Sequence, residues 1–193
     1  MNGPRNRGFT LLELLVTVAV AAVLLGIGVP SFIDTVRNNQ MAASANDLLA
    51  AMHLARTEAV KRRTPVTVCS SANPLAAPVC SAGSFNGWVV FADTDGDITV
   101  DPPPNEIVLW AHGTLPATIT TLSDSSFVSF AGTGFRRDSG GSPSAATIRL
   151  CDERGNVDAG GGISTARVLQ IAATGRPQIL RAVADVTAAG DCP

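Results

Sequence analysis

A long apolar segment lies near the start of the chain and contains a single charged side chain. From Leu11 to Val29 the only ionisable residue is Glu13. At about 1.5 Å of rise per residue, a helix of this length spans roughly the 30 Å hydrocarbon core of a bilayer. Because lipid offers no partners to main-chain polar groups, a helix is the expected conformation. The pattern predicts a membrane-spanning helix over residues 9–30.

The charges around this segment predict its orientation. Arg5 and Arg7 precede it, and no basic residue follows until Arg37. Positive charge stays on the cytoplasmic side of a membrane. We therefore expect a single-pass protein with a cytoplasmic N-terminus and with everything after Pro30 outside.

Glu13 indicates a functional role, because a carboxylate in a membrane helix costs at least about 2.5 kcal/mol on insertion scales. A partner would arise if the chain were cut after Gly8, since the new amine of Phe9 would lie one helical turn away or on a neighbouring subunit. Two alternatives remain at this point. A secretory signal peptide would be removed near residue 30, although the Ala19-Val20-Ala21 triplet lies within the apolar run. A plain signal anchor would leave Glu13 unexplained.

Beyond Pro30 the apolar positions recur at helical spacing. Pro30 is expected to kink or loosen the helix, and Pro65 to end it. The resulting segment, 31–64, is predicted to be amphipathic. Its apolar stripe consists of Met41, Ala45, Leu48, Met52, Ala55 and Ala59.

The rest of the chain, 65–193, is predicted to form short antiparallel strands with no intervening helix, because β-branched and aromatic runs alternate with Gly, Pro, Asn and Asp. The expected strands are 66–69, 87–92, 106–111, 127–131, 147–151, 166–173 and 177–184. The predicted fold class is α+β, with a long N-terminal helix packed on a β-rich globular domain.

The four cysteines, Cys69, Cys80, Cys151 and Cys192, all follow the apolar segment, which suits two disulfides in an oxidising compartment. Three connectivities are possible. Cys69 with Cys80 and Cys151 with Cys192 is favoured, because the first pair closes a short loop and the second ties the last residues to an inner strand. Metal binding is the alternative, but no Cys-x-x-Cys pair occurs.

The N-terminal segment Gly8-Phe9-Thr10-Leu11-Leu12-Glu13-Leu14 resembles the processing site of type IV pilins and type II secretion pseudopilins. The resemblance implies that a prepilin peptidase cuts after Gly8 and methylates Phe9. It also implies that Glu13 pairs with the amine of an adjacent subunit during filament assembly, so that the implied partners are this peptidase, other pilin or pseudopilin subunits and the bacterial inner membrane.

Four later segments resemble the GspH/FimT family of minor pilins and pseudopilins. They are Ala55-Arg56-Thr57-Glu58-Ala59-Val60, Asn86-Gly87-Trp88-Val89-Val90-Phe91-Ala92-Asp93, Cys151-Asp152-Glu153-Arg154-Gly155 and Ala173-Thr174-Gly175-Arg176-Pro177. The resemblance implies a pilin-like fold and a low-abundance subunit near a filament tip.

DNA binding is a further implication, because some members use a C-terminal Gly-Arg-x-Arg motif. Here the matching positions read Gly175-Arg176-Pro177-Gln178, so the second arginine is missing, although Arg181 follows. Arginines concentrate in the last third of the chain, but acidic residues lie among them, and the formal net charge of the chain is −2 with a pI near 5.6. Such a surface would bind phosphates weakly and in a salt-sensitive way.

No metal, cofactor or enzymatic activity is expected. Asp93-Thr94-Asp95-Gly96-Asp97 resembles the opening of a calcium loop, but Ile98 and Pro104 stand where an EF-hand needs glycine and glutamate. Asp95-Gly96 instead predicts a turn between strands. His53 and His112 belong to no metal spacing or catalytic triad.

The sequence therefore predicts a minor pilin or pseudopilin with its globular domain in the periplasm or, after assembly, outside the cell. The alternatives are a DNA receptor for uptake and a secreted binding domain or enzyme released from a signal peptide. Pilus and secretion members share all the features used above.

Overall fold

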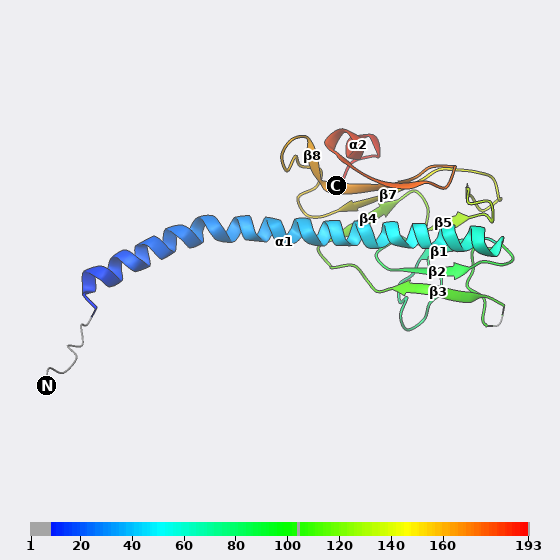
Figure 1. Cartoon of the computed structure of the whole chain (residues 1–193), viewed down its shortest axis with the longest axis horizontal. Coiled ribbons are helices and arrows are strands. Elements are labelled where there is room, and N and C mark those ends of the chain that lie inside the picture. The colour runs from blue at the N-terminus through cyan, green and yellow to red at the C-terminus, as the bar shows by residue number, and fades with distance from the viewer. Residues whose placement is uncertain (1–8, 104, 193) are drawn as a thin grey trace. The chain divides into compact units, whose positions relative to one another are not determined.

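The protein is described by a computed structural model covering residues 9–103 and 105–192 (Figure 1). It contains two compact units, one ending at Asn39 and the other beginning at Gln40. We call the second unit the head. The helix α1, Leu11–Arg62, contributes residues to both units.

The first unit is helical and apolar. Its α1 residues include an 18-residue window with a mean hydropathy of 2.5, and none of that window is buried. This helix is long and apolar enough to cross a membrane. The predicted cut after Gly8 concerns residues outside those that the structure describes.

The part of α1 that belongs to the head is amphipathic, as predicted. All six residues of the apolar stripe are buried: Met41, Ala45, Leu48, Met52, Ala55 and Ala59. The helix ends at Arg62, and Arg63 follows with a φ of 59°, before Pro65. The periodicity therefore identified the face of α1 that packs in the core.

Two antiparallel sheets form the rest of the head. The first has the order β3-β2-β1-β5-β6, from Ile107–His112, Trp88–Ala92, Val66–Ser70, Phe127–Phe130 and Arg136–Arg137. The second has the order β4-β7-β8-β9, from Thr120–Ser123, Ala146–Cys151, Ile163–Ile171 and Pro177–Ala182. A short helix, α2 (Val183–Ala188), follows β9.

One hydrophobic core joins α1 to both sheets. The α1 stripe lies in a cluster with Val68 and Phe130 of the first sheet and with Ile148 and Leu169 of the second. Alternate residues of a strand face opposite sides. Accordingly, Val89 and Phe91 pack in a separate cluster with Cys69 on the other face of the first sheet.

All seven predicted strands are present, with ends that agree within a few residues. The prediction missed two strands, β4 and β6, and the helix α2. β4 and β6 are too short and polar to show a strand period. The expected strand 177–184 ends at Ala182, and the expectation that no helix occurs here was wrong. α2 exists because Val186 packs against Ala166 and Val168, a tertiary contact that no local period reveals.

Both favoured disulfides are present. Cys69 is bonded to Cys80 with Cα atoms 5.4 Å apart, and Cys151 to Cys192 with Cα atoms 5.8 Å apart. The guanidinium of Arg149 also donates to the carbonyls of Gly190 and Asp191. The C-terminal residues are thus fixed to β7 by a covalent bond and by hydrogen bonds.

Candidate functional site

The first turn of α1 places Glu13 in a reciprocal pair with Thr10. The amide of Glu13 donates to the Thr10 hydroxyl at 3.2 Å, and the amide of Thr10 lies 3.5 Å from a Glu13 carboxylate oxygen. This is a capping box, which satisfies two main-chain donors that a helix start leaves unpaired. The Thr10-x-x-Glu13 spacing is a sequence signature of such a box, and reasoning from the charge of Glu13 alone missed it.

The carboxylate of Glu13 is accessible to a second chain. Both Thr10 and Glu13 are exposed, and Phe9 is 81% exposed. The long bond to the Thr10 amide is the weaker member of the pair. The capping box therefore holds the Glu13 carboxylate at the start of α1, where a cation can approach it from solvent.

The C-terminal motif residues separate into one structural residue and two exposed arginines. Gly175 is buried, has a φ of +78°, and lies so close to the carbonyl oxygen of Gly134 that a Cβ would collide with it. Arg176 is exposed on the β8–β9 turn. Gln178, at the position of the missing arginine, donates to the side chain of Gln170 at 2.9 Å.

Arg181 lies in a different neighbourhood from the turn that carries Arg176. It is exposed near the end of β9 and close to Arg167. Burial, together with the charges of Arg181 and Arg154, lowers the pKa of Arg167. The structure therefore does not support treating Arg176 and Arg181 as one pair.

Arg176 instead belongs to a group of cations that come from two segments distant in the sequence. Arg56 donates from Nε to the Gly134 carbonyl at 3.1 Å and from Nη2 to the Thr174 carbonyl at 3.3 Å. Gly132 packs against the main chain of Arg63. The end of α1 thus meets both the β5–β6 turn and the β8–β9 turn.

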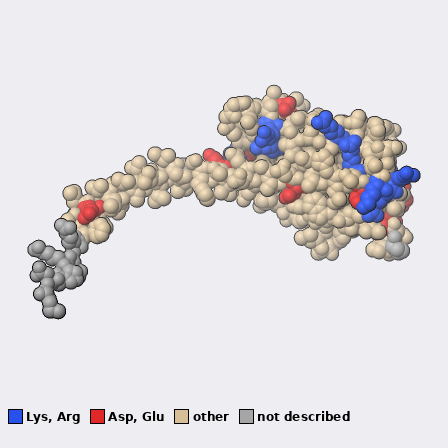
Figure 2. All heavy atoms as spheres, viewed as in Figure 1, with Lys and Arg blue, Asp and Glu red and all other residues tan. Residues whose placement is uncertain are grey.

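We call this group the cationic end. It consists of Arg56, Lys61, Arg62, Arg63 and Arg176. Figure 2 shows lysine and arginine side chains gathered at the end of the head where α1 ends. Glu58 forms ion pairs with Lys61 at 3.2 Å and with Arg62 at 2.7 Å, and these bonds lower the pKa of its carboxyl. One carboxylate offsets two of the five cations.

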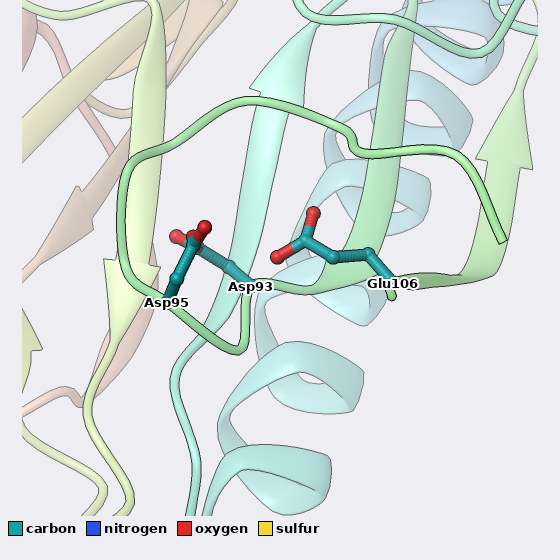
Figure 3. Close-up of side chains that lie close together, drawn as sticks. All are labelled: Asp93, Asp95 and Glu106. Carbon is teal, nitrogen blue, oxygen red and sulfur yellow. The ribbon is translucent and has the colours of Figure 1, made fainter. Parts of the chain in front are cut away.

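Three carboxylates converge on the loop between β2 and β3. The side chains of Asp93, Asp95 and Glu106 point toward one another, and their oxygens lie within 4.8 Å (Figure 3). Burial raises the pKa of Glu106, more than the main-chain bonds from Asp101 and Thr94 lower it.

Internal hydrogen bonds account for the two buried members of this cluster. Glu106 accepts from the amides of Thr94 at 2.7 Å and Asp101 at 3.1 Å. Asp93 accepts from the Thr67 hydroxyl at 2.7 Å and, more weakly, from the Ile98 amide at 3.5 Å. Because every oxygen of these two carboxylates binds the chain, we interpret the cluster as the support of a turn.

His112 is placed by packing contacts. Its ring is stacked on Trp88, with centroids 4.0 Å apart and planes 6° from parallel. Nδ1 lies 2.7 Å from the Gly113 carbonyl, and Nε2 lies 3.5 Å from an Asp47 oxygen on α1. His53 is exposed on α1. His112 therefore serves to join β3 to the helix.

Comparison with known protein families matches two segments of the chain. Residues 44–175 match the family described as type II transport protein GspH. This chain belongs to the GspH family. Residues 3–29 match the prokaryotic N-terminal methylation motif, which contains the Gly8-Phe9 junction and Glu13.

Individual relatives match either a short segment of the chain or most of the chain at low sequence identity. The type IV major pilin protein PilA of Myxococcus xanthus strain DK1622 is 48% identical over 44 residues, which are 22% of this chain and 20% of that relative. Two crystal structures of the type IV minor pilin FimU from Pseudomonas aeruginosa PAO1 resemble the GspH-family chain. One has 23% identity and a TM-score of 0.49 over 74% of this chain and 89% of FimU. The other has 20% identity and a TM-score of 0.46 over 72% and 91%.

Proposed function

We propose that this GspH-family chain is a minor pilin or pseudopilin subunit of a type IV pilus or type II secretion filament. Prepilin peptidase cuts after Gly8 and methylates Phe9. The mature subunit stays in the inner membrane through α1, with its head in the periplasm, until it joins the filament. Assembly and recognition are its activities.

The observation that carries this proposal is the exposed carboxylate of Glu13 at the start of an exposed apolar helix. The methylation motif match over residues 3–29 supports the proposal, because that segment contains both the predicted cut after Gly8 and Glu13. A free amine at Phe9 supplies the cation that a carboxylate at membrane depth requires. This ion pair forms only when the neighbouring subunit lies at one axial position, so it fixes the register between subunits.

The test is the replacement of Glu13 by valine in the full chain. The Glu13→Val subunit should remain in the membrane fraction, because its segment becomes more apolar. Its recovery in sheared filaments or in cross-linked subunit complexes should fall at least about tenfold, which corresponds to about 1.4 kcal/mol. Leu12→Val, one position away, is the matched control and should assemble normally. Unaltered incorporation of Glu13→Val contradicts the pairing role.

The cationic end favours a second function, the binding of DNA by the assembled subunit. Lys61, Arg62, Arg63 and Arg176 are exposed, and they come from two segments that the fold brings together. Phosphate contacts of this kind give sequence-independent, salt-dependent binding. Retardation of DNA at about 50 mM salt should be lost in an Arg63→Ala, Arg176→Ala double variant. Arg181→Ala is the control and should bind normally. The absence of any retardation with the unmodified protein refutes this second function.

A further inference from the structure

An open pocket of about 310 Å³ lies on the β5–β6 hairpin. Its wall includes Phe135, Pro143, Ala131 and Arg137. Phe135 is 45% exposed, and among the described Phe and Trp residues of the head it is the one that is exposed. An aromatic ring open to solvent in a concave, mainly apolar wall is suited to a planar ligand.

Arg137 gives one side of this pocket a positive charge. Its Nη2 donates to the Gly96 carbonyl at 2.9 Å, which fixes the guanidinium on the neighbouring turn. Its Nε is buried and has no hydrogen-bond partner among the described residues. Among the described residues Arg137 forms no ion pair with a carboxylate, so no direct partner neutralises its charge.

The β5–β6 turn, which forms part of the pocket wall, also contacts the cationic end. The turn that carries Phe135 also carries Gly134, whose carbonyl accepts from Arg56, and Gly132, which packs on the main chain of Arg63. A negatively charged chain lying on Arg63 therefore comes close to the turn that carries Phe135. Alternating charge and aromatic surface is the arrangement that binds single-stranded nucleic acid, in which phosphates meet cations and bases stack on rings.

We propose that the Phe135 pocket takes an unpaired base of single-stranded DNA whose phosphates lie on the cationic end. This proposal rests on the second function above, DNA binding, and specifies single-stranded DNA as the ligand. A duplex keeps its bases stacked inside, so it uses the cations but not the pocket. The structure thus predicts a preference for single strands that depends on Phe135.

The experiment measures fluorescence anisotropy of the full chain in detergent micelles with a labelled oligothymidine of about 20 nucleotides and with a duplex of equal length. Phe135→Ala should weaken binding of the single strand roughly tenfold and leave duplex binding within about twofold. Ile163→Ala is the matched control, because Ile163 is similarly exposed, at 41%, and belongs to β8. It should change neither affinity.

The cations provide the second arm of the same experiment. Arg62→Ala with Arg63→Ala should weaken binding of both probes and reduce the slope of affinity against salt. If the unmodified protein binds both probes alike and Phe135→Ala changes nothing, DNA binding stands and the base pocket is wrong. If Phe135→Ala weakens both probes equally, the pocket is also wrong. If the unmodified protein binds neither probe, DNA binding and the pocket fail together.

Discussion

Arg56 on α1 donates a hydrogen bond of 3.1 Å to the carbonyl of Gly134, a residue 78 positions later in the chain. A second bond, to the carbonyl of Thr174, connects the same guanidinium to the β8–β9 turn. One side chain therefore holds two turns from different sheets against the end of the helix. The cationic end exists because of this arrangement.

Replacing Arg56 by methionine should destabilise the head. Methionine keeps an unbranched apolar stem but donates no hydrogen bond, so two carbonyls lose their charged donor. We expect a loss of about 1–3 kcal/mol in the free energy of unfolding, measured by chemical denaturation of the full chain in micelles. Arg62→Met on the same helix is the control, because its exposed ion pair with Glu58 contributes less than about 1 kcal/mol. Equal effects of the two substitutions contradict the role assigned to Arg56.

Gly175 is required by the fold, whatever ligand the head binds. In Gly175→Ala the new methyl group meets the carbonyl of Gly134 in a backbone with a φ of +78°. Gly161→Ala imposes a similar backbone, with a φ of +67°, but has no atom within 4 Å of the new methyl group. We expect Gly161→Ala to cost roughly 1–2 kcal/mol through backbone strain alone.

Gly175→Ala should cost a further 1–3 kcal/mol, approximately, through the collision. Denaturation midpoints of the two variants measure the difference. If Gly175→Ala is no less stable than Gly161→Ala, the close approach to Gly134 does not restrict this position.

The capping box predicts that Thr10 and Glu13 act together at the start of α1. Thr10→Val removes the hydroxyl that accepts from the Glu13 amide, whereas Thr10→Ser keeps it. Loss of a cap costs about 1 kcal/mol, so the Glu13 amide should exchange with solvent about fivefold faster in Thr10→Val. Hydrogen exchange followed by NMR in micelles measures this rate. Equal exchange in the valine and serine variants contradicts the box.

Glu106 makes the stability of the head depend on pH with a defined sign. Burial raises the pKa of its carboxyl in the folded state above the ordinary value that the unfolded chain keeps. The folded state therefore binds more protons between these two values, and the contribution of Glu106 to stability falls as the pH rises through them. The stability of the unmodified protein relative to Glu106→Gln should decrease from about pH 4 upward. A difference that grows with pH contradicts burial as the dominant cause.

Local patterns predicted the elements whose causes are local. The α1 stripe from Met41 to Ala59 repeats at helical spacing, and each of its members is buried. The Asp95-Gly96 pair lies at a bend of the β2–β3 loop, in which Gly96 has a φ of +82°. In both cases the sequence signal is local, because it comes from residue types at short spacing along the chain.

The cationic end and α2 escaped prediction because contacts distant in the chain create them. Nothing near Arg63 in the sequence indicates that the β5–β6 turn packs on its main chain, or that Thr174 lies beside Arg56. The sequence suggested that Arg176 and Arg181 act together, whereas Arg181 lies near the end of β9, close to Arg167. Arg176 was thus identifiable from the sequence, but the surface that it shares with the end of α1 was not.

The start of the mature chain tests the central claim most directly, because processing at Gly8-Phe9 distinguishes a filament subunit from a secreted or simply anchored protein. The measurement is mass spectrometry of the N-terminal peptide of the protein purified from membranes of cells that contain its prepilin peptidase. A chain beginning with N-methylated Phe9 is the predicted result. A chain beginning at Met1, or at a residue near Pro30, would contradict the account.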